Sequence, residues 1–320
     1  MASLLIIGGS GFFGKSILDS YKRGLLHPWE IDSISIVARN STRLRHNFPG
    51  LIDKSIKLFD SDISSCQEVP AADYVIHAAA STDASRYFER PEVEKANVLG
   101  AVSNYANLAQ KFHKNSKILY VSSGAIYGVQ PHYLSNISED FFCGDIEGMD
   151  LTKRSYAAAK RDSEKIIEEL GSLGLSVSIA RCFAFVGKYL PRDKHFAIGN
   201  FIEDGLNGRA IRINATHRVY RSYMYADELV EWLMSILCLS DNTCPTYNVG
   251  SDQSVEILEV ARKVAKIFRV EVSAAAHNAY EENDRYVPNI QKACIQAGVS
   301  LNLNLDQSLE LTVNRILSNE

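Results

Sequence analysis

The sequence predicts an α/β fold, a doubly wound parallel sheet with helices on both faces. Three observations support this prediction. Short runs rich in β-branched residues alternate with longer segments of helical periodicity up to about residue 185. The first of these runs leads directly into a glycine-rich turn, GGSGFFG at residues 8–14. The chain has 320 residues, 46% of them apolar, which is enough to bury a full core around such a sheet.

Six short apolar runs are the expected strands. Near-continuous apolar runs of this length, bounded by polar or turn residues, are typical of parallel strands that are buried on both faces. The runs are residues 3–8, 33–39, 55–60, 73–79, 117–123 and 176–181.

Two longer segments between these runs are expected helices. Pro91 stands at the first position of residues 91–112, where its missing N–H breaks no helical hydrogen bond. Gly171 closes the second segment, residues 155–170. Parallel strands need crossover connections of this kind, so the alternation favours a parallel sheet.

An aromatic-rich loop marks a change of pattern after about residue 185. Short strands are expected at residues 210–214 and 246–250. A helix is expected from Ser254, which suits an N-cap, through Phe268.

This change suggests two lobes. We expect residues 1–185 to form the sheet domain and residues 186–320 to form a smaller carboxyl-terminal α/β lobe that holds the substrate. The alternative is that the chain returns to the sheet around residues 215–250. No obvious linker separates the lobes, so we expect them to pack closely over a shared cleft.

Composition limits the partners. The net charge of −4 and the scattered basic residues provide no electrostatic footprint for nucleic acid or an anionic membrane, so neither is expected as a partner. The first residues lack a basic leader, and no stretch approaches the roughly 20 apolar residues that span a bilayer, so we expect a cytoplasmic protein. Its six cysteines contain no CxxC pair, which argues against a zinc site and a disulfide framework; no metal is expected.

The glycine-rich turn predicts a dinucleotide site of the Rossmann type. A glycine turn between a strand and a helix makes a backbone cradle for a pyrophosphate, with the helix amides and dipole directed at its charge. The spacing differs from GxGxxG by one residue, and a tight turn without a ligand is the alternative. The position directly after the first strand favours the cofactor. The expected contacts are Gly8, Ser10, Gly11, Phe12, Phe13 and Gly14.

The end of the second strand bears on the choice of cofactor. An acid there would accept hydrogen bonds from the adenosine ribose diol, but the residue is Arg39, with Arg43 and Arg45 nearby. Guanidinium groups suit a 2′-phosphate, so we favour NADP. NAD remains possible, in which case Arg39 stacks on adenine or faces solvent. Asp62 and Ile63, after the third strand, could frame the adenine; the alternative for Asp62 is a helix cap.

A tyrosine and a lysine on one helical face predict redox chemistry at a hydroxyl-bearing carbon. Tyr156 and Lys160 are four residues apart, so the cation can favour the phenolate and make the phenol a usable acid or base. YxxxK also occurs by chance. However, SSGAIYG at residues 122–128 ends an expected strand at the ligand-binding edge of the sheet. There Ser123 can donate to a substrate oxygen while Tyr156 exchanges the proton and Lys160 holds the nicotinamide ribose.

Together these residues resemble the extended short-chain dehydrogenase/reductases that modify nucleotide-linked sugars. The resemblance covers nearly the whole chain. Besides GGSGFFG, SSGAIYG and YAAAK it rests on HAAAS (77–81), NVLG (97–100), RCFAFVG (181–187), RSYMYADEL (221–229), YNVGS (247–251) and RYVPNIQKA (285–293).

The resemblance implies further site residues and a homodimer. It makes Ser123 the catalytic hydroxyl, and it implies a dimer that pairs through the helices around Asn97 and Tyr156, where the alanines 157–159 permit close approach. Two of the implied substrate contacts are Arg221 and Arg285, and the alternative for both is a surface salt bridge. The implied cofactor contacts are Ala78, Ala79, Ala80 and Asn97, and the implied contacts to a nucleotide-diphosphate sugar are Ser81, Asn200, Arg221 and Arg285.

Departures from the family pattern narrow the reaction. The 4,6-dehydratases of the family carry an Asp-Glu pair after the catalytic hydroxyl, whereas this chain has Gly124 and Ala125. Elimination of water is therefore disfavoured. We predict a nucleotide-sugar epimerase that acts at C4 through a 4-keto sugar. The alternatives are an NADPH-dependent 4-keto-sugar reductase, a uronic-acid sugar decarboxylase or 4,6-dehydratase, and a cofactor-sensing scaffold without catalysis.

Overall fold

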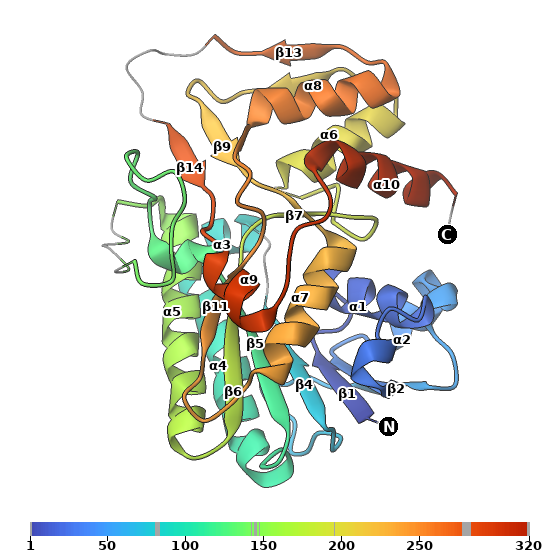
Figure 1. Cartoon of the computed structure of the whole chain (residues 1–320), viewed down its shortest axis with the longest axis vertical. Coiled ribbons are helices and arrows are strands. Elements are labelled where there is room, and N and C mark those ends of the chain that lie inside the picture. The colour runs from blue at the N-terminus through green and yellow to red at the C-terminus, as the bar shows by residue number, and fades with distance from the viewer. Residues whose placement is uncertain are drawn as a thin grey trace.

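The computed structural model describes residues 2–80, 84–141, 143, 146, 148–194, 196–276 and 283–318. Its centre is a seven-stranded parallel sheet with the strand order β11-β6-β5-β4-β1-β2-β3 (Figure 1). The predicted fold class is confirmed, and each of the six expected strands is present to within about two residues. The strands are β1 (Ala2–Ile7), β2 (Ile31–Ala38), β3 (Ile56–Asp60), β4 (Tyr74–His77), β5 (Lys117–Ser123), β6 (Ser176–Cys182) and β11 (Thr246–Val249).

Helices cover both faces of the sheet. On one face lie α1, α2, α7 and α9, and on the other lie α4 and α5, on which α3 packs (Figure 1). Pro91 is the first residue of its helix, as predicted, and Gly171 lies in the last turn of α5 rather than after it. The bounds are α1 (Phe12–Lys22), α2 (Thr42–Asn47), α3 (Ala84–Glu89), α4 (Pro91–Phe112), α5 (Leu151–Ser172), α7 (Ala226–Cys238) and α9 (Gln291–Ala297), with short 3-10 turns at His27–Trp29, Pro49–Leu51 and Gly124–Tyr127.

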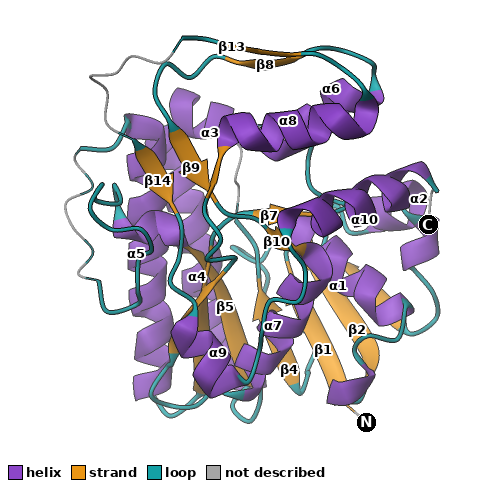
Figure 2. Ribbon diagram, turned by 45° about the horizontal axis from the view of Figure 1, so that its top comes forward, coloured by secondary structure: helices purple, strands orange, loops and turns teal. Residues whose placement is uncertain are grey.

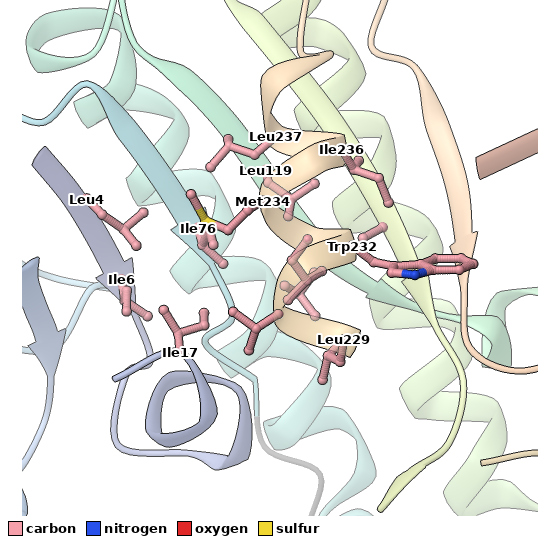
Figure 3. Close-up of a cluster of buried hydrophobic side chains, with 14 of the residues drawn as sticks. Leu4, Ile6, Ile17, Ile76, Leu119, Leu229, Trp232, Met234, Ile236 and Leu237 are labelled. Atoms are coloured by element: carbon pink, nitrogen blue, oxygen red, sulfur yellow. The ribbon is translucent and has the colours of Figure 1, made fainter. Parts of the chain in front are cut away.

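The alternation of side chains along β1 explains why the sheet is buried on both faces. Leu4 and Ile6 belong to the core beneath α1 and α7, whereas Leu5 and Ile7 belong to the core beneath α4 and α5. Figure 3 shows the first of these cores, where strand residues meet Leu229 and its neighbours on α7. Each fully buried leucine or isoleucine contributes roughly 1.5–3 kcal/mol to folding relative to an exposed one.

The strand β11 decides between the two arrangements considered for this part of the chain. Residues 246–250 do not lie in the smaller lobe; as in the alternative, they return to the sheet, where β11 pairs in parallel with β6, with Thr246 opposite Ile179 and Val249 opposite Cys182. The chain therefore returns to the main sheet and completes its edge. Its residues Tyr247 and Val249 are buried in the core beneath α7.

A second group of elements lies beyond the carboxyl ends of the sheet strands (Figure 1). There α8 packs against α6, with the β8–β13 pair beside them (Figure 2), and the two helices share a third apolar core. These elements are α6 (Ala197–Leu206), α8 (Ile257–Phe268), α10 (Leu305–Leu317), β7 (Phe185–Val186), β8 (Ile211–Ile213), β9 (Val219–Arg221), β10 (Met224–Tyr225), β12 (Val255–Glu256), β13 (Val272–Ala274) and β14 (Asp284–Tyr286).

The expected cap at Ser254 is wrong. The helix α8 begins only after Glu256, because Val255 and Glu256 are extended and pair with β9 as β12. Pairing with β9 keeps these two residues extended, so Ser254 does not cap the helix and Glu256 is the N-cap residue. Of the helices in the described ranges, none is both long enough and apolar enough to cross a membrane.

Candidate active site

The glycine turn after β1 has the geometry of a phosphate cradle. Gly8 has a φ of +87°, and a Cβ there would lie 2.7 Å from the Cα of Ala79. A Cβ on Gly14 would lie 2.2 Å from the carbonyl oxygen of Gly9. Gly11 is the N-cap of α1 and supplies no side-chain cap, and the first turn of that helix carries no acid. The amides at this helix end therefore suit a pyrophosphate, so the chain fits a dinucleotide cofactor.

The two phenylalanines of the turn have a structural role. The rings of Phe12 and Phe13 pack on Phe185 at centroid distances of 6.1 and 5.7 Å. Because their side chains are occupied in joining α1 to β7, they can reach a cofactor chiefly through their backbone. Ser10, by contrast, is exposed.

The loop after β4 lies directly beside the glycine turn. The N–H of Ala78 donates to the carbonyl of Ile7 at 2.8 Å, and Ala78, Ala79 and Ala80 are all partly buried. Ser81 lies outside the described residues. Asn97 is exposed on α4, and its amide is 3.4 Å from the Glu94 carboxylate.

Arg39 is exposed at the end of β2, where the cofactor's adenosine end is expected. It lies near Asp62, whose pKa is held below its usual value mainly by the Ser64 N–H and hydroxyl, at 2.9 and 2.7 Å, with a further contribution from the Arg39 charge. Asp62 therefore caps the turn that follows it. Ile63 is 6% exposed and belongs to the core, which leaves little of its side chain for an adenine.

Ser123, Tyr156 and Lys160 are brought together at the carboxyl end of β5. Ser123 ends that strand, and its Oγ accepts a hydrogen bond from the Ala125 N–H at 3.2 Å. Burial raises the pKa of Tyr156, while the Lys160 charge and a hydrogen bond from Ser123 oppose that rise. The net effect is a raised pKa, so the phenol is held protonated, and the Lys160 charge is the contribution that favours loss of its proton.

Two hydrogen-bond acceptors hold the ammonium group of Lys160. It is 2% exposed, and its Nζ donates to the carbonyl of Val121 at 2.7 Å and to the hydroxyl of Tyr120 at 3.1 Å. An ammonium has three donors, so one remains for a ligand such as a ribose hydroxyl. Burial lowers the pKa of Lys160, and the neighbouring Tyr156 and Glu164 oppose that change.

A buried polar network supports this centre, and the sequence analysis missed it. The Glu164 carboxylate accepts from the Ser122 hydroxyl and from Arg181, whose Nη2 is 2.8 Å away. Arg181 also donates to the hydroxyl of Tyr127 at 3.0 Å, and that hydroxyl donates to Asn248 at 2.7 Å. The network joins α5, β5, β6 and β11 directly behind Ser123 and Lys160. The only sequence signal was the position of Glu164 four residues after Lys160.

A second missed residue is Tyr286 on β14. Its hydroxyl lies 3.3 Å from the Oγ of Ser123 and 3.3 Å from the carbonyl oxygen of Cys182, and it can donate its proton to either. Its ring lies 4.6 Å, centroid to centroid, from the ring of Phe183. A phenol from the carboxyl-terminal part of the chain thus reaches the hydroxyl of Ser123.

The two arginines predicted to clasp a diphosphate lie on opposite faces of their strands. Tyr286 is opposite Arg221 and Arg285 is opposite Tyr220 in the parallel β9–β14 pair, and residues in register share a face. Arg285 accordingly lies over the Tyr220 ring at 4.3 Å. Arg221 pairs with Asp284 at 2.8 Å on the face that carries Tyr286. Only Arg221 therefore shares a face with the residue that reaches Ser123.

Asn200 lies in the first turn of α6 and is partly buried, so its side chain remains accessible to a ligand. The position after Ser123 is sterically closed, because a Cβ on Gly124 would lie 2.6–2.7 Å from the ring of Phe183. A carboxylate has no room there.

In the described part of the chain, no cluster of histidine, cysteine or acidic side chains could hold a metal ion.

Comparison with known proteins identifies the family of this chain. The family described as NAD dependent epimerase/dehydratase matches residues 4–250. The UDP-glucuronic acid decarboxylase 6 of Arabidopsis thaliana is 24% identical over 312 residues, covering 96% of this chain and 87% of that protein. The dTDP-D-glucose 4,6-dehydratase of Dictyostelium discoideum is 27% identical over 277 residues, covering 82% and 62%.

Solved structures share the fold over the whole chain. The UDP-glucose 4-epimerase of Thermotoga maritima, solved with UDP-glucose, superposes with a TM-score of 0.81 at 17% identity and covers 99% of each chain. The dTDP-glucose 4,6-dehydratase of Streptomyces venezuelae, solved with NAD and TYD, superposes with a TM-score of 0.83 at 18% identity and covers 99% of this chain and 97% of its own. The chain belongs to the NAD-dependent epimerase/dehydratase family, among the extended short-chain dehydrogenase/reductases.

Proposed function

We propose that this enzyme is an epimerase that inverts carbon 4 of a nucleotide-linked sugar. The observation that carries the proposal is the meeting of Ser123, Tyr156 and Lys160 at the end of β5 without a carboxylate at either of the next two positions. These three groups suffice for reversible oxidation of a hydroxyl. Nothing at Gly124 or Ala125 could protonate a leaving hydroxyl.

Each residue has a defined task in this reaction. Tyr156, with its phenolate favoured by Lys160, takes the proton of the sugar 4-hydroxyl, and Ser123 donates a hydrogen bond to the same oxygen as it becomes a carbonyl. When bound, the nicotinamide cofactor supplies the hydride acceptor and donor. The keto sugar then rotates in the site and is reduced from its other face. Tyr156 returns the proton to the 4-oxygen, and carbon 4 now has the opposite configuration.

The binding groups fit a nucleotide diphosphate. The amides of the glycine turn suit the cofactor's pyrophosphate, and the guanidinium of Arg221, 22% exposed, is available for the substrate's phosphates once it leaves Asp284. The relatives named above act on UDP- or dTDP-linked sugars according to their names. We therefore propose the same substrate class here.

Isotope retention tests the proposal. The purified protein is incubated with UDP- and dTDP-sugars that carry deuterium at C4, without added NADPH. We expect the C4 epimer with its deuterium retained, because an epimerase returns the hydride that it took. Solvent protium at C4, or no epimer with any sugar, would contradict the proposal.

A 4-keto-sugar reductase is the second candidate, and the exposed Arg39 favours it because a 2′-phosphate suits a guanidinium. A reductase would convert only 4-keto sugars and would oxidise one NADPH for each product.

UDP-glucuronic acid tests decarboxylation, which begins with the same oxidation and releases carbon dioxide from the resulting β-keto acid. Failure of every sugar would favour a cofactor-sensing scaffold.

We also propose a homodimer that pairs through α4 and α5. These helices pack on each other within the chain. Ala157 and Ala159 are fully buried there, so of the three alanines only the partly buried Ala158 remains to allow a close approach by a second copy. Two-fold pairing is the commonest closed symmetry for soluble proteins. Light scattering at micromolar concentration should return about twice the monomer mass, and a monomeric mass would contradict this assembly.

A further inference from the structure

The hydroxyl of Tyr286 has two acceptors within reach, and one of them is the catalytic hydroxyl. Ser123 Oγ and the Cys182 carbonyl both lie 3.3 Å from it. The phenol has a single proton, so it can donate to only one of them at a time. The acceptor to which Tyr286 donates therefore affects which acceptor the Ser123 proton can use.

Counting hydrogen bonds at Ser123 makes the consequence explicit. A serine hydroxyl has one donor and two acceptor sites, and the Ala125 N–H fills one acceptor site at 3.2 Å. If Tyr286 donates to the other acceptor site, the Ser123 proton is free for the substrate oxygen or Tyr156. If Tyr286 donates to the Cys182 carbonyl instead, its hydroxyl oxygen can accept the Ser123 proton and so competes with the substrate oxygen for it.

We propose that Tyr286 is a positioning residue that directs the Ser123 proton toward the reacting oxygen. This inference rests on the proposed oxidation by Ser123, Tyr156 and Lys160. A hydroxyl that accepts a hydrogen bond also becomes a better donor, so the phenol strengthens the Ser123 hydrogen bond as well as aiming it.

The surroundings hold the phenol in place. Its ring packs on Phe183, and Tyr286 is opposite Arg221 in the β9–β14 register. The charged or titratable groups that act on it are Tyr156 on α5, Cys182 on β6 and Arg221 on β9. Burial raises the pKa of Tyr286 well above its usual value, so the group stays a protonated donor through the neutral range.

The first test compares Tyr286→Phe with wild type. The ring and its packing on Phe183 remain, so the fold should survive, which an unchanged melting temperature would verify. With the sugar that the isotope experiment identifies as substrate, we expect kcat to fall about five- to tenfold and KM to stay nearly unchanged, as for the loss of one hydrogen bond. Tyr247→Phe is the matched control, since it removes a phenol hydrogen bond of 3.0 Å to Gln296 outside the site.

A double variant asks whether Tyr286 acts through Ser123. If it does, Tyr286→Phe combined with Ser123→Ala should be no slower than Ser123→Ala alone. Multiplied losses in the double variant would overturn the proposal. So would an activity of Tyr286→Phe equal to that of wild type.

The decisive readout needs no substrate. The Ser123 hydrogen bond lowers the pKa of Tyr156, so weakening it in Tyr286→Phe should move the ionisation of Tyr156 to higher pH. This can be followed in the NADP-loaded protein by NMR of ¹³Cζ-labelled tyrosine, with the Tyr156 signal assigned by its loss in Tyr156→Phe. An unchanged ionisation overturns the proposal. A shifted ionisation in a protein that converts no sugar would support it while the epimerase proposal fails.

Discussion

Arg181 and Glu164 form an ion pair of 2.8 Å directly behind Ser123 and Lys160, with side chains only 12% and 7% exposed. Arg181 ends up at this position from β6 and Glu164 from α5, so the pair ties the sheet to the helix that carries Tyr156 and Lys160. Its charge-assisted bonds also keep Ser122, the neighbour of Ser123, in one orientation.

Glu164→Gln is expected to destabilise the protein by about 3 kcal/mol, because it leaves a buried guanidinium without its counter-charge. Urea unfolding measures the loss. Glu169→Gln on the exposed face of the same helix is the matched control and should change stability by less than about 0.5 kcal/mol. Equal losses in the two variants would mean that the pair contributes nothing specific.

Tyr156→Phe should lower the turnover rate at least about a hundredfold while cofactor affinity is retained, because the phenol exchanges the substrate proton and the ring packing survives. The ring of Tyr87 lies 5.5 Å from that of Tyr156, and its buried hydroxyl has no partner among the described residues. Tyr87→Phe should therefore leave the rate nearly unchanged. Near wild-type turnover in Tyr156→Phe would remove that residue from the mechanism.

Arg39→Ala should weaken NADP about tenfold or more and leave NAD nearly unaffected, since a bond between guanidinium and phosphate is lost only for the former. Calorimetric titration of both cofactors measures this. Arg262→Ala removes an exposed arginine on α8, away from β2, and serves as the control for the loss of one positive charge. A clear preference of the wild type for NAD would overturn the proposed NADP choice.

Gly8→Ala should abolish cofactor binding and reduce stability by several kcal/mol. The residue has a φ of +87°, which costs an alanine roughly 1–2 kcal/mol, and the added Cβ would meet Ala79 at 2.7 Å. Gly174→Ala isolates the backbone cost, because Gly174 has a φ of +92° and nothing within 4 Å of the added Cβ. Similar melting temperatures for the two variants would show that the Ala79 contact is unimportant.

Much of the fold and part of the site could be predicted from the sequence, because these features depend on local order along the chain. Buried parallel strands must be apolar on both faces, so the runs that became β1, β2 and β5 were visible as such. The glycine turn and the pair Tyr156 and Lys160 are fixed by spacings within one turn or one helix face.

Only the tertiary structure decided which distant residues meet. The strand β11 joined the main sheet and β12 displaced the expected cap, because hydrogen bonds to β6 and β9 outweigh local signals that are worth about 1 kcal/mol. At β14 the motif drew attention to Arg285, yet the register turned the neighbouring Tyr286 toward Ser123. A shift of one residue in a strand exchanges its faces, and no pattern along a three-residue strand specifies that register.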